Sequence, residues 1–373
     1  MDQSDDILAM LRDAAGDFIG GRFDAAGLQR DPLEPRAVDR ALWTEMADMG
    51  WLAVALPEEA GGSGLGLVGV TALAELFGRT QFPAPFVACA AMPSVLLAQA
   101  PAPAGAALTP LLHGGERLMT LAWQEQAGQI ELGTPATRLQ RGTVTGRKLF
   151  VPGVQADSVL LVYASRDGVP ALVAVAADGP GVIVELAAAG SGTYASVNFE
   201  QAPVLNETVL LAGEVATGAL QAALSAGRIA LSAQLAGLAA GCLEKTIAYV
   251  GDRVQFGQPI GTFQAIQHRC VDLHIDVLLA GASWRHALAA FTENPALAST
   301  QAAVSAAKAR CGEVAVKVAR QAVQMHGAMG FAEESGVGSY LRAALQGASH
   351  LGGPDQHRRR FVQFQSIKEQ VHG

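Results

Sequence analysis

The chain has 373 residues, of which 50% are hydrophobic and only 16% are charged, and its formal net charge is −8 at pH 7. This composition is too apolar for a disordered chain. The acidic balance lacks the basic footprint of a nucleic-acid-binding protein, so we expect no nucleic acid as a partner. At roughly 100–200 residues per domain, the length predicts two or three domains.

The spacing of the cysteines and histidines predicts neither a metal site nor a disulfide framework. The four cysteines are far apart and form no CxxC pair, and His268 and His274 are six residues apart without further ligands nearby. The N-terminus is acidic where a signal peptide would be basic. Prolines or polar and charged residues interrupt the two most apolar stretches, so we expect no membrane span. A cytoplasmic location is therefore predicted.

The first part of the chain, residues 1–117, has a helical pattern. Leu42, Met46, Met49 and Leu52 recur at three- to four-residue spacing, as on one face of a helix. A glycine-rich segment at 57–64 marks a turn after them.

The middle part, residues 118–213, changes to a strand pattern. Segments 143–151, 158–163 and 171–175 are rich in β-branched residues and are separated by glycine-containing turns. Because no helical pattern lies between them, we expect an antiparallel barrel or sandwich rather than a parallel sheet.

The last part, residues 214–373, returns to long helical runs. Segments 216–250, 264–294 and 296–353 contain no proline and are rich in Ala, Leu, Gln and Arg. They predict long helices packed as a bundle. The run Arg358–Arg360 is interpreted as a solvated helix face. The chain is thus expected to be α+β, with an N-terminal helical domain at 1–117, a middle β domain at 118–213 and a C-terminal bundle at 214–373.

The polar segment 249–267 lies where two of these long helices should meet. Arg253 offers a permanent planar charge that suits a phosphate, Phe256 can cover an aromatic ring, and Gln264 can bridge to a polar cofactor edge. An ordinary helix connection with an arginine cap explains the same residues equally well.

Four ordered segments resemble the acyl-CoA dehydrogenase family and cover nearly the whole chain. Arg253-x-Gln255-Phe256-Gly257 with Phe263-Gln264 is similar to the family's flavin-contacting signature. The others are 324–331 with 340–342, 42–62, and 122–125 with 146–157. Each match alone is moderately specific, and together they are strong.

The resemblance implies a fold, a cofactor and a reaction. The fold would be an N-terminal α-helical domain, a middle antiparallel β-barrel and a C-terminal four-helix bundle, assembled as dimers or as pairs of dimers. The cofactor would be FAD held between two subunits, and the substrate an acyl-CoA thioester. The family removes the α-proton as H⁺ and passes the β-hydrogen as hydride to flavin N5. An electron-transfer flavoprotein would accept the electrons.

The same resemblance implies residue roles. Those that match flavin-contacting positions are Gln124, Glu125, Phe150, Pro152, Arg253, Gln255, Phe256, Gln264, Gln324 and Gly327. The last six would reach the FAD of the neighbouring subunit. Arg228 matches an arginine near bound acyl-CoA. Pro152 lacks an N–H and a hydroxyl, which weakens any contact there, and Ala328 replaces the second glycine of a pair that many members have.

Both positions where the family places its catalytic glutamate hold other residues. A gap-free count puts one at Leu351 and the other at Gly227, and no acid lies between Glu334 and Asp355. General-base catalysis contributes about 10²–10⁴ in rate. The chain therefore resembles a subunit of the heteromeric type that lacks the base and works with a sister subunit, several of which act on bulky thioesters such as steroid side chains.

Two alternatives stay open at this point. One is a self-sufficient homo-oligomeric dehydrogenase with a displaced base, for which Glu125, Glu334 and His350 are candidates. A histidine at a helix C-terminus, favoured by the helix dipole, is the simpler interpretation of His350. The other is a relative with different flavin chemistry, or a scaffold without flavin.

Overall fold

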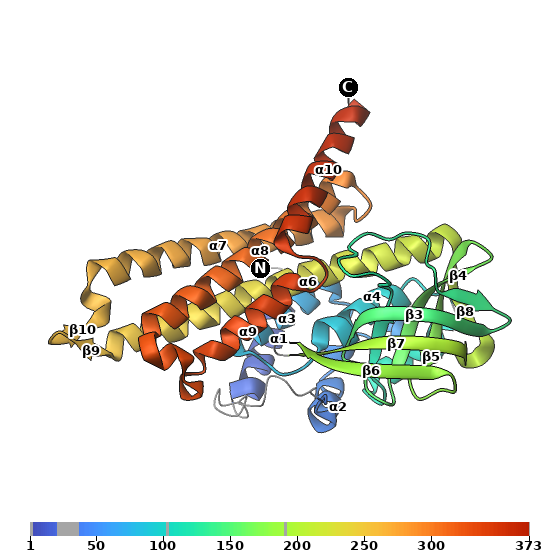
Figure 1. Cartoon of the computed structure of the whole chain (residues 1–373), viewed down its shortest axis with the longest axis horizontal. Helices are drawn as coiled ribbons and strands as arrows, with labels where there is room; N and C mark the ends of the chain where they lie inside the picture. Colours follow the sequence, from blue (N-terminus) through green and yellow to red (C-terminus); the bar gives the residue numbers. More distant parts are fainter. Residues whose placement is uncertain (1–2, 21–36, 102–103, 190–191, 373) are drawn as a thin grey trace. The chain divides into compact units, whose positions relative to one another are not determined.

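The computed structural model describes residues 3–20, 37–101, 104–189 and 192–372 (Figure 1). They divide into two compact units, each built from segments that are not contiguous in sequence. Unit 1 contains residues 3–20, 71–83 and 228–372, and unit 2 contains the rest of the described chain.

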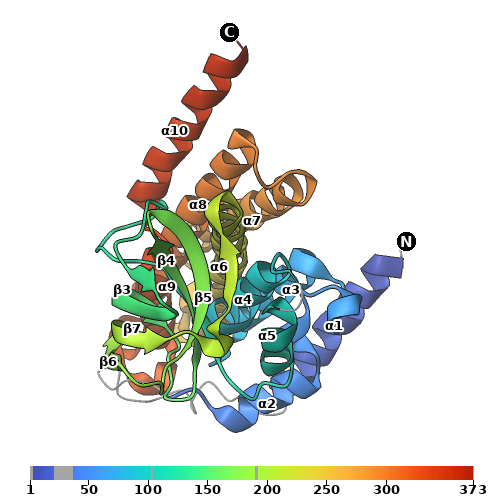
Figure 2. The same ribbon diagram turned by 90° about the vertical axis from the view of Figure 1, so that its right-hand side faces the viewer.

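A mixed β-sheet dominates unit 2 (Figure 2). Its strands are β1 (Met119–Ala122), β2 (Arg138–Gln140), β3 (Thr143–Pro152), β4 (Val159–Arg166), β5 (Val169–Ala176), β6 (Val182–Ala189), β7 (Gly192–Pro203) and β8 (Val209–Ala212). They follow the order β6-β7-β3-β2-β4-β5-β8, and β1 also pairs with β4.

The sheet has the expected, mainly antiparallel pairing and adds two parallel pairings that were not predicted. Most neighbours are antiparallel, but β1 pairs parallel with β4 at Met119–Val159, and β2 pairs parallel with β4 at Arg138–Ser165. After β1 the chain leaves the sheet at 123–137 and returns as β2, which lies beside β4 and runs in the same direction. This connection contains no helix. The absence of a helical pattern in this part of the sequence therefore did not distinguish parallel from antiparallel pairing.

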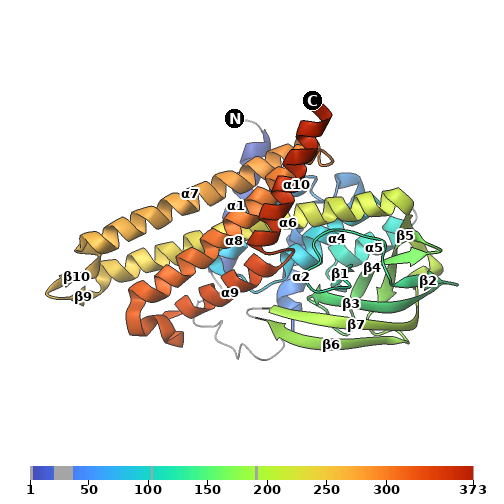
Figure 3. The ribbon, with the colours of Figure 1, turned by 45° about the horizontal axis from the view of Figure 1, so that its top comes forward.

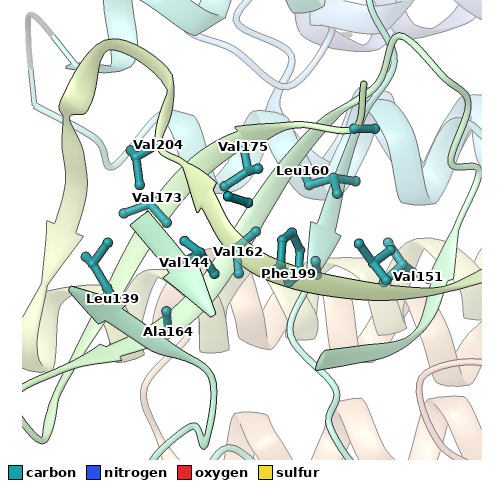
Figure 4. Packing of buried hydrophobic residues seen from close by; sticks show 14 of the residues in the cluster. Leu139, Val144, Val151, Leu160, Val162, Ala164, Val173, Val175, Phe199 and Val204 are labelled. Carbon is teal, nitrogen blue, oxygen red and sulfur yellow. The ribbon is translucent and has the colours of Figure 1, made fainter. Parts of the chain in front are cut away.

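The sheet buries a core of aliphatic side chains (Figure 4). Leu160, Val162 and Ala164 alternate along β4 and meet Val173 of β5 and Phe199 of β7. Alternate residues of a strand share one face, so these β4 side chains lie on the same side of the sheet, although every residue of β4 except Arg166 is buried. Each such aliphatic side chain, fully buried, contributes about 1.5–3 kcal/mol.

Short helices complete unit 2. They are α2 (Arg40–Asp48), α4 (Met92–Leu97), α5 (Ala104–His113) and a π-helix at Val87–Ala91. Asp39 caps α2, because its carboxylate accepts from the backbone N–H of Ala41 at 3.0 Å and of Leu42 at 3.1 Å. Met49, expected on the buried face, instead ends the helix and is exposed, since Gly50 turns left-handed directly after it.

Unit 1 is helical (Figures 1 and 3). It holds α1 (Gln3–Gly20), α7 (Gln264–Glu293), α8 (Ala298–His326), α9 (Val337–Ser349), α10 (Pro354–His372), most of α3 (Gly66–Thr80) and the later half of α6 (Gly213–Asp252). The central helix is α8, which packs against α7, α9 and α10. The domain limits predicted from sequence stay a prediction.

The run Arg358–Arg360 is only partly solvated. Arg360 is buried, and its guanidinium donates to the Gln301 carbonyl at 3.2 Å and to Ser305 Oγ at 2.8 Å. It therefore attaches α10 to α8, whereas Arg358 pairs with Asp355 and Glu313 at the surface. Helical spacing places neighbouring residues on different faces, which explains the split.

Helices α3 and α6 cross in backbone contact within unit 1. A Cβ on Gly78 would lie 1.8 Å from the Gln234 carbonyl oxygen, and one on Gly237 would lie 1.9 Å from that of Glu75. No residue with a side chain fits either position. The glycine and alanine content of these helices is therefore what permits the approach.

Helix α6 is also the one helix, among the described residues, that is long and apolar enough to cross a membrane. Within the fold, 89% of its apolar window is buried.

Candidate functional site

The expected flavin contacts in unit 2 begin directly after β1. Gln124 donates from its side-chain amide to the Gln129 carbonyl at 2.8 Å, and its own carbonyl accepts from the Leu149 N–H at 2.8 Å. These bonds fix the loop after β1 against the neighbouring end of β3.

Glu125 is the anchor of that loop. Its carboxylate accepts from Lys148 Nζ at 2.7 Å and from the backbone N–H groups of Ala136 and Thr137 at 2.7 and 2.9 Å. Burial by itself raises the pKa of Glu125, but Lys148, Thr137 and Ala136 together outweigh it and hold the pKa below its usual value. A carboxylate engaged in this way is a structural anion, so the geometry does not favour Glu125 as a displaced base.

Lys148 is the partner of Glu125, and the sequence reasoning missed it. Its side chain is fully buried, and burial lowers its pKa to about 8 despite the opposing charge of Glu125. The available signal was its inward position on β3, two residues from Gly146 and four from buried Val144. A lysine at an inward strand position requires polar partners for its ammonium, and an acid such as Glu125 also neutralises its charge.

Phe150 and Pro152 lie on the irregular end of β3. The pairing of β3 with β7 shifts register between Lys148 and Val151, and Phe150 has a left-handed φ of 54°. Such a bulge redirects a side chain, and the Phe150 ring is 47% exposed. Pro152 closes the strand opposite Tyr194 and offers no N–H. The flavin contact of Phe150 and the weakened contact at Pro152 stay predictions.

In unit 1 the expected flavin contacts gather on a small hairpin between α6 and α7 (Figure 3). Strands β9 (Val254–Gln255) and β10 (Gln258–Pro259) are joined by Phe256 and Gly257, with φ of 53° and 82°. Positive φ at both positions defines a turn that normally holds Asn-Gly. Phe256 occupies it at a conformational cost and is 93% exposed, with its ring edge-on to Phe263.

Three predicted polar residues share this hairpin. Arg253 closes its base, because the Arg253 carbonyl accepts from the Ile260 N–H at 2.8 Å. Gln255 lies on β9, Gln264 begins α7, and all three side chains are exposed. The arrangement fits a ligand with a planar ring and phosphates: an aromatic face, a guanidinium and amide groups lie within a dozen residues.

A second predicted segment, at the end of α8, is tied to the base of the hairpin. The Tyr249 ring stacks on His326 at 4.1 Å between centroids, and the Tyr249 hydroxyl donates to the His326 carbonyl at 3.3 Å. Gln324 is in the last turn of α8, and Gly327 ends it at φ 61° and ψ −132°. Only glycine adopts this conformation readily, and a Cβ there would meet no atom within 4 Å. The turn therefore leaves open space beside the hairpin base.

The structure also brings Arg228 to Leu351, one of the two expected base positions. Arg228 is fully buried in α6, and its Nε donates to the Leu351 carbonyl at 3.4 Å. The Leu351 side chain is buried as well. Gly227, the other expected base position, directly precedes Arg228 on the helix.

Neither of the other candidate bases is poised for proton abstraction. Burial, with the nearby Lys308 charge, lowers the pKa of His350 to about 3, which makes it a weak base. Glu334 is exposed on a short helical turn, Glu333–Ser335. No group of three or more potential metal ligands occurs in the part of the chain that the structure describes.

Comparison with known proteins identifies the relatives of this arrangement. The family descriptions "Acyl-CoA dehydrogenase, N-terminal domain" and "Acyl-CoA dehydrogenase, C-terminal domain" match residues 6–102 and 217–366. FadE27 of Mycobacterium tuberculosis, an acyl-CoA dehydrogenase, is 29% identical over 89% of both chains. IpdE2 of Mycolicibacterium smegmatis is 38% identical over 122 residues, which is 32% of this chain and 36% of that one.

Two solved structures share the whole fold. A variant described as the Tcur3481-Tcur3483 steroid ACAD superposes with a TM-score of 0.84 at 27% identity, covering 100% of both chains. The ChsE4-ChsE5 complex from Mycobacterium tuberculosis gives a TM-score of 0.84 at 25% identity, covering 98% of both chains.

Proposed function

The chain belongs to the acyl-CoA dehydrogenase family of FAD-binding oxidoreductases, and we propose that it takes part in α,β-desaturation of an acyl-CoA thioester as a subunit without its own catalytic base. FAD supplies the hydride acceptor when bound. The α-proton must leave to a separate base, which in this proposal a sister subunit provides.

The observation that carries the proposal is Leu351. It occupies an expected base position with a buried aliphatic side chain, beside Arg228, which matches an arginine near acyl-CoA in the family. Gly227 has no side chain to offer. Glu125, Glu334 and His350 are respectively ion-paired, exposed and weakly basic. The self-sufficient alternative therefore lacks a suitably placed base among the candidates.

The chain's own residues would bind and orient FAD. In unit 2, Glu125 and Lys148 hold the loop that carries Gln124, and Phe150 presents its ring. In unit 1, Arg253, Phe256 and Gly327 would serve the FAD of a neighbouring subunit. The exposure of Phe256 in an unfavourable turn supports this assignment, because strain and exposure together point to binding.

The relatives support a proposal for the substrate and the partner. One similar structure is described as a steroid ACAD and another as a complex of ChsE4 and ChsE5. We therefore favour a bulky thioester, such as a steroid side chain, and a hetero-oligomer with a sister dehydrogenase subunit. An electron-transfer flavoprotein would be the acceptor.

Activity of the chain alone and with a partner tests the proposal. The chain is purified by itself, its flavin absorption is recorded, and acyl-CoA oxidation is assayed with an artificial electron acceptor. We expect negligible turnover alone and turnover after co-expression with a sister subunit. Robust turnover by the lone chain contradicts the proposal, and absence of flavin in every preparation favours a scaffold.

Restoring the base provides the matched variant pair. Leu351→Glu places a carboxylate at the empty position, and Leu351→Gln has the same shape without a charge. We expect turnover of the lone chain to rise about 10²-fold in Leu351→Glu and not in Leu351→Gln, because a positioned base contributes on that scale. Equal effects of the two variants contradict the assignment of position 351.

A further inference from the structure

Lys308 has an unusual environment for a lysine. It lies on α8 with no exposed surface, and its ammonium donates to the carbonyl oxygens of Gly347 at 3.1 Å, Ala348 at 2.9 Å and Gly352 at 3.0 Å. An ammonium has three donors, so all of them are used. All three partners are neutral backbone groups.

These carbonyls belong to the two sides of one sharp corner. Gly347 and Ala348 are in the last turn of α9, where backbone carbonyls have no partner within the helix and form the negative end of its dipole. Gly352 lies beyond the turn, just before α10 begins at Pro354. One buried cation therefore joins the end of α9 to the segment that leads into α10.

The corner between them is strained. Leu351 has a φ of 57°, a left-handed conformation that costs a residue with a side chain about 1–2 kcal/mol. Its carbonyl is held by His357 at 3.0 Å, where the neutral ring must donate from Nε2, and by Arg228 Nε at 3.4 Å. Side chains from α6, α8 and α10 thus hold one corner through its backbone oxygens.

We propose that Lys308 is a positioning residue that fixes residues 347–352 and so determines where the side chain at position 351 lies. The hold on the corner does not depend on the proposed function. Its importance for catalysis does, because it rests on position 351 being the place of the base.

Hydrogen exchange of the full chain tests the hold on the corner. The N–H groups of His350 and Gly352 bond to the Gln346 and Ser349 carbonyls at 3.0 and 3.2 Å, and they report opening there. At pH 6.0 we expect Lys308→Met to speed their exchange about tenfold or more, while α7 changes less than twofold. Lys308→Arg should restore part of the protection.

Lys317→Met is the matched control, because Lys317 is on the same helix but pairs with Asp276 at the surface. If Lys308→Met does not fold, Lys308→Gln takes its place. Its side chain keeps two donors, so we expect a smaller rise in the exchange rate of the His350 and Gly352 N–H groups. Corner exchange that stays within twofold of wild type in the neutral variants overturns the proposal.

The catalytic part is tested in the Leu351→Glu background. There we expect Lys308→Met to lower kcat about tenfold or more with KM within twofold, and Lys308→Arg to recover part of kcat. An unchanged kcat overturns the positioning of residue 351. If Leu351→Glu alone shows no turnover, the assignment of position 351 as the place of the base fails, whereas the exchange experiment still decides whether Lys308 holds the corner, and co-expression with a sister subunit still tests the proposed function.

Discussion

Glu125 and Lys148 form an ion pair of 2.7 Å that joins the loop after β1 to β3, with the lysine side chain fully buried. The pair is local to unit 2 and involves an expected flavin-contacting residue, so it connects the stability of the sheet with the shape of the proposed site.

Removing one partner of this pair should be costly. We expect Glu125→Gln to lower the free energy of unfolding by about 3–5 kcal/mol, because Lys148 is left buried without its counter-charge. Urea denaturation measures the change. The exposed Glu200→Gln is the control and should change stability by less than about 0.5 kcal/mol. A loss below about 1 kcal/mol for Glu125→Gln contradicts the buried pair.

His357 should make the protein sensitive to mild acid. Burial and the charges of Arg228 and Lys308 lower its pKa to about 2 from 6.5, so the unfolded chain binds a proton that the folded chain does not. The stability associated with the neutral ring is present above pH 6.5 and is lost as the pH falls, by about 2 kcal/mol at pH 5.

The variant His357→Gln can still donate to the Leu351 carbonyl. Between pH 6.5 and 5 its free energy of unfolding should fall by about 2 kcal/mol less than that of the wild type. Chemical denaturation at both pH values gives the comparison. His268→Gln, at an exposed histidine, is expected to behave as wild type. An unchanged acid sensitivity in His357→Gln contradicts the prediction.

The crossing of α3 and α6 should tolerate no methyl group. Gly237→Ala places a Cβ 1.9 Å from the Glu75 carbonyl oxygen and should cost about 2–3 kcal/mol or prevent folding. Gly218→Ala on the same helix meets no atom within 4 Å and should add about 0.5–1 kcal/mol of stability. Thermal denaturation of both variants checks the contrast. Equal changes in melting temperature for Gly237→Ala and Gly218→Ala contradict the prediction.

Phe256 should trade stability for binding. Phe256→Asn gives the turn its preferred Asn-Gly sequence, so we expect a stability gain of about 0.5–1 kcal/mol. The ring is lost at the same time, and we expect about tenfold weaker retention of FAD. Melting temperature and flavin absorption are measured on the same preparation, with exposed Leu297→Ala as the control. Undiminished flavin binding argues against a role of Phe256 at the cofactor.

The sequence predicted the large features because proline-free runs of helix formers and β-branched segments bounded by turns are local signals. The long helices α7 and α8 and the strands β3, β4 and β5 correspond to segments predicted in this way. What it did not predict depends on contacts distant in sequence. The strands β1 and β4 pair in parallel although β2 and β3 lie between them in the chain, and Met49 ends its helix because Gly50 turns left-handed.

The site shows the same division. Motif residues such as Arg253 and Phe256 were found because they are close together in the chain. Lys148 and Lys308 were missed, because a buried lysine is recognised only through partners that are 23 to 44 residues away. The left-handed conformation of Leu351 could not be predicted, because glycine is the residue that normally signals this conformation and here it stands at position 352 instead of 351.

The crossing of α3 with α6 can form only late in translation, after both helices have been synthesised. Residues 71–83 are made early and can meet α1, yet the part of α6 that Gly78 contacts begins only at residue 228, after all of unit 2 has been synthesised. At about 5–20 residues per second, this segment waits on the order of 10 s for α6 to emerge. During translation, unit 2 can form its sheet while the bare glycine face of α3 is still exposed, so a stalled or truncated chain would present that face to the chaperones and proteases of the cell.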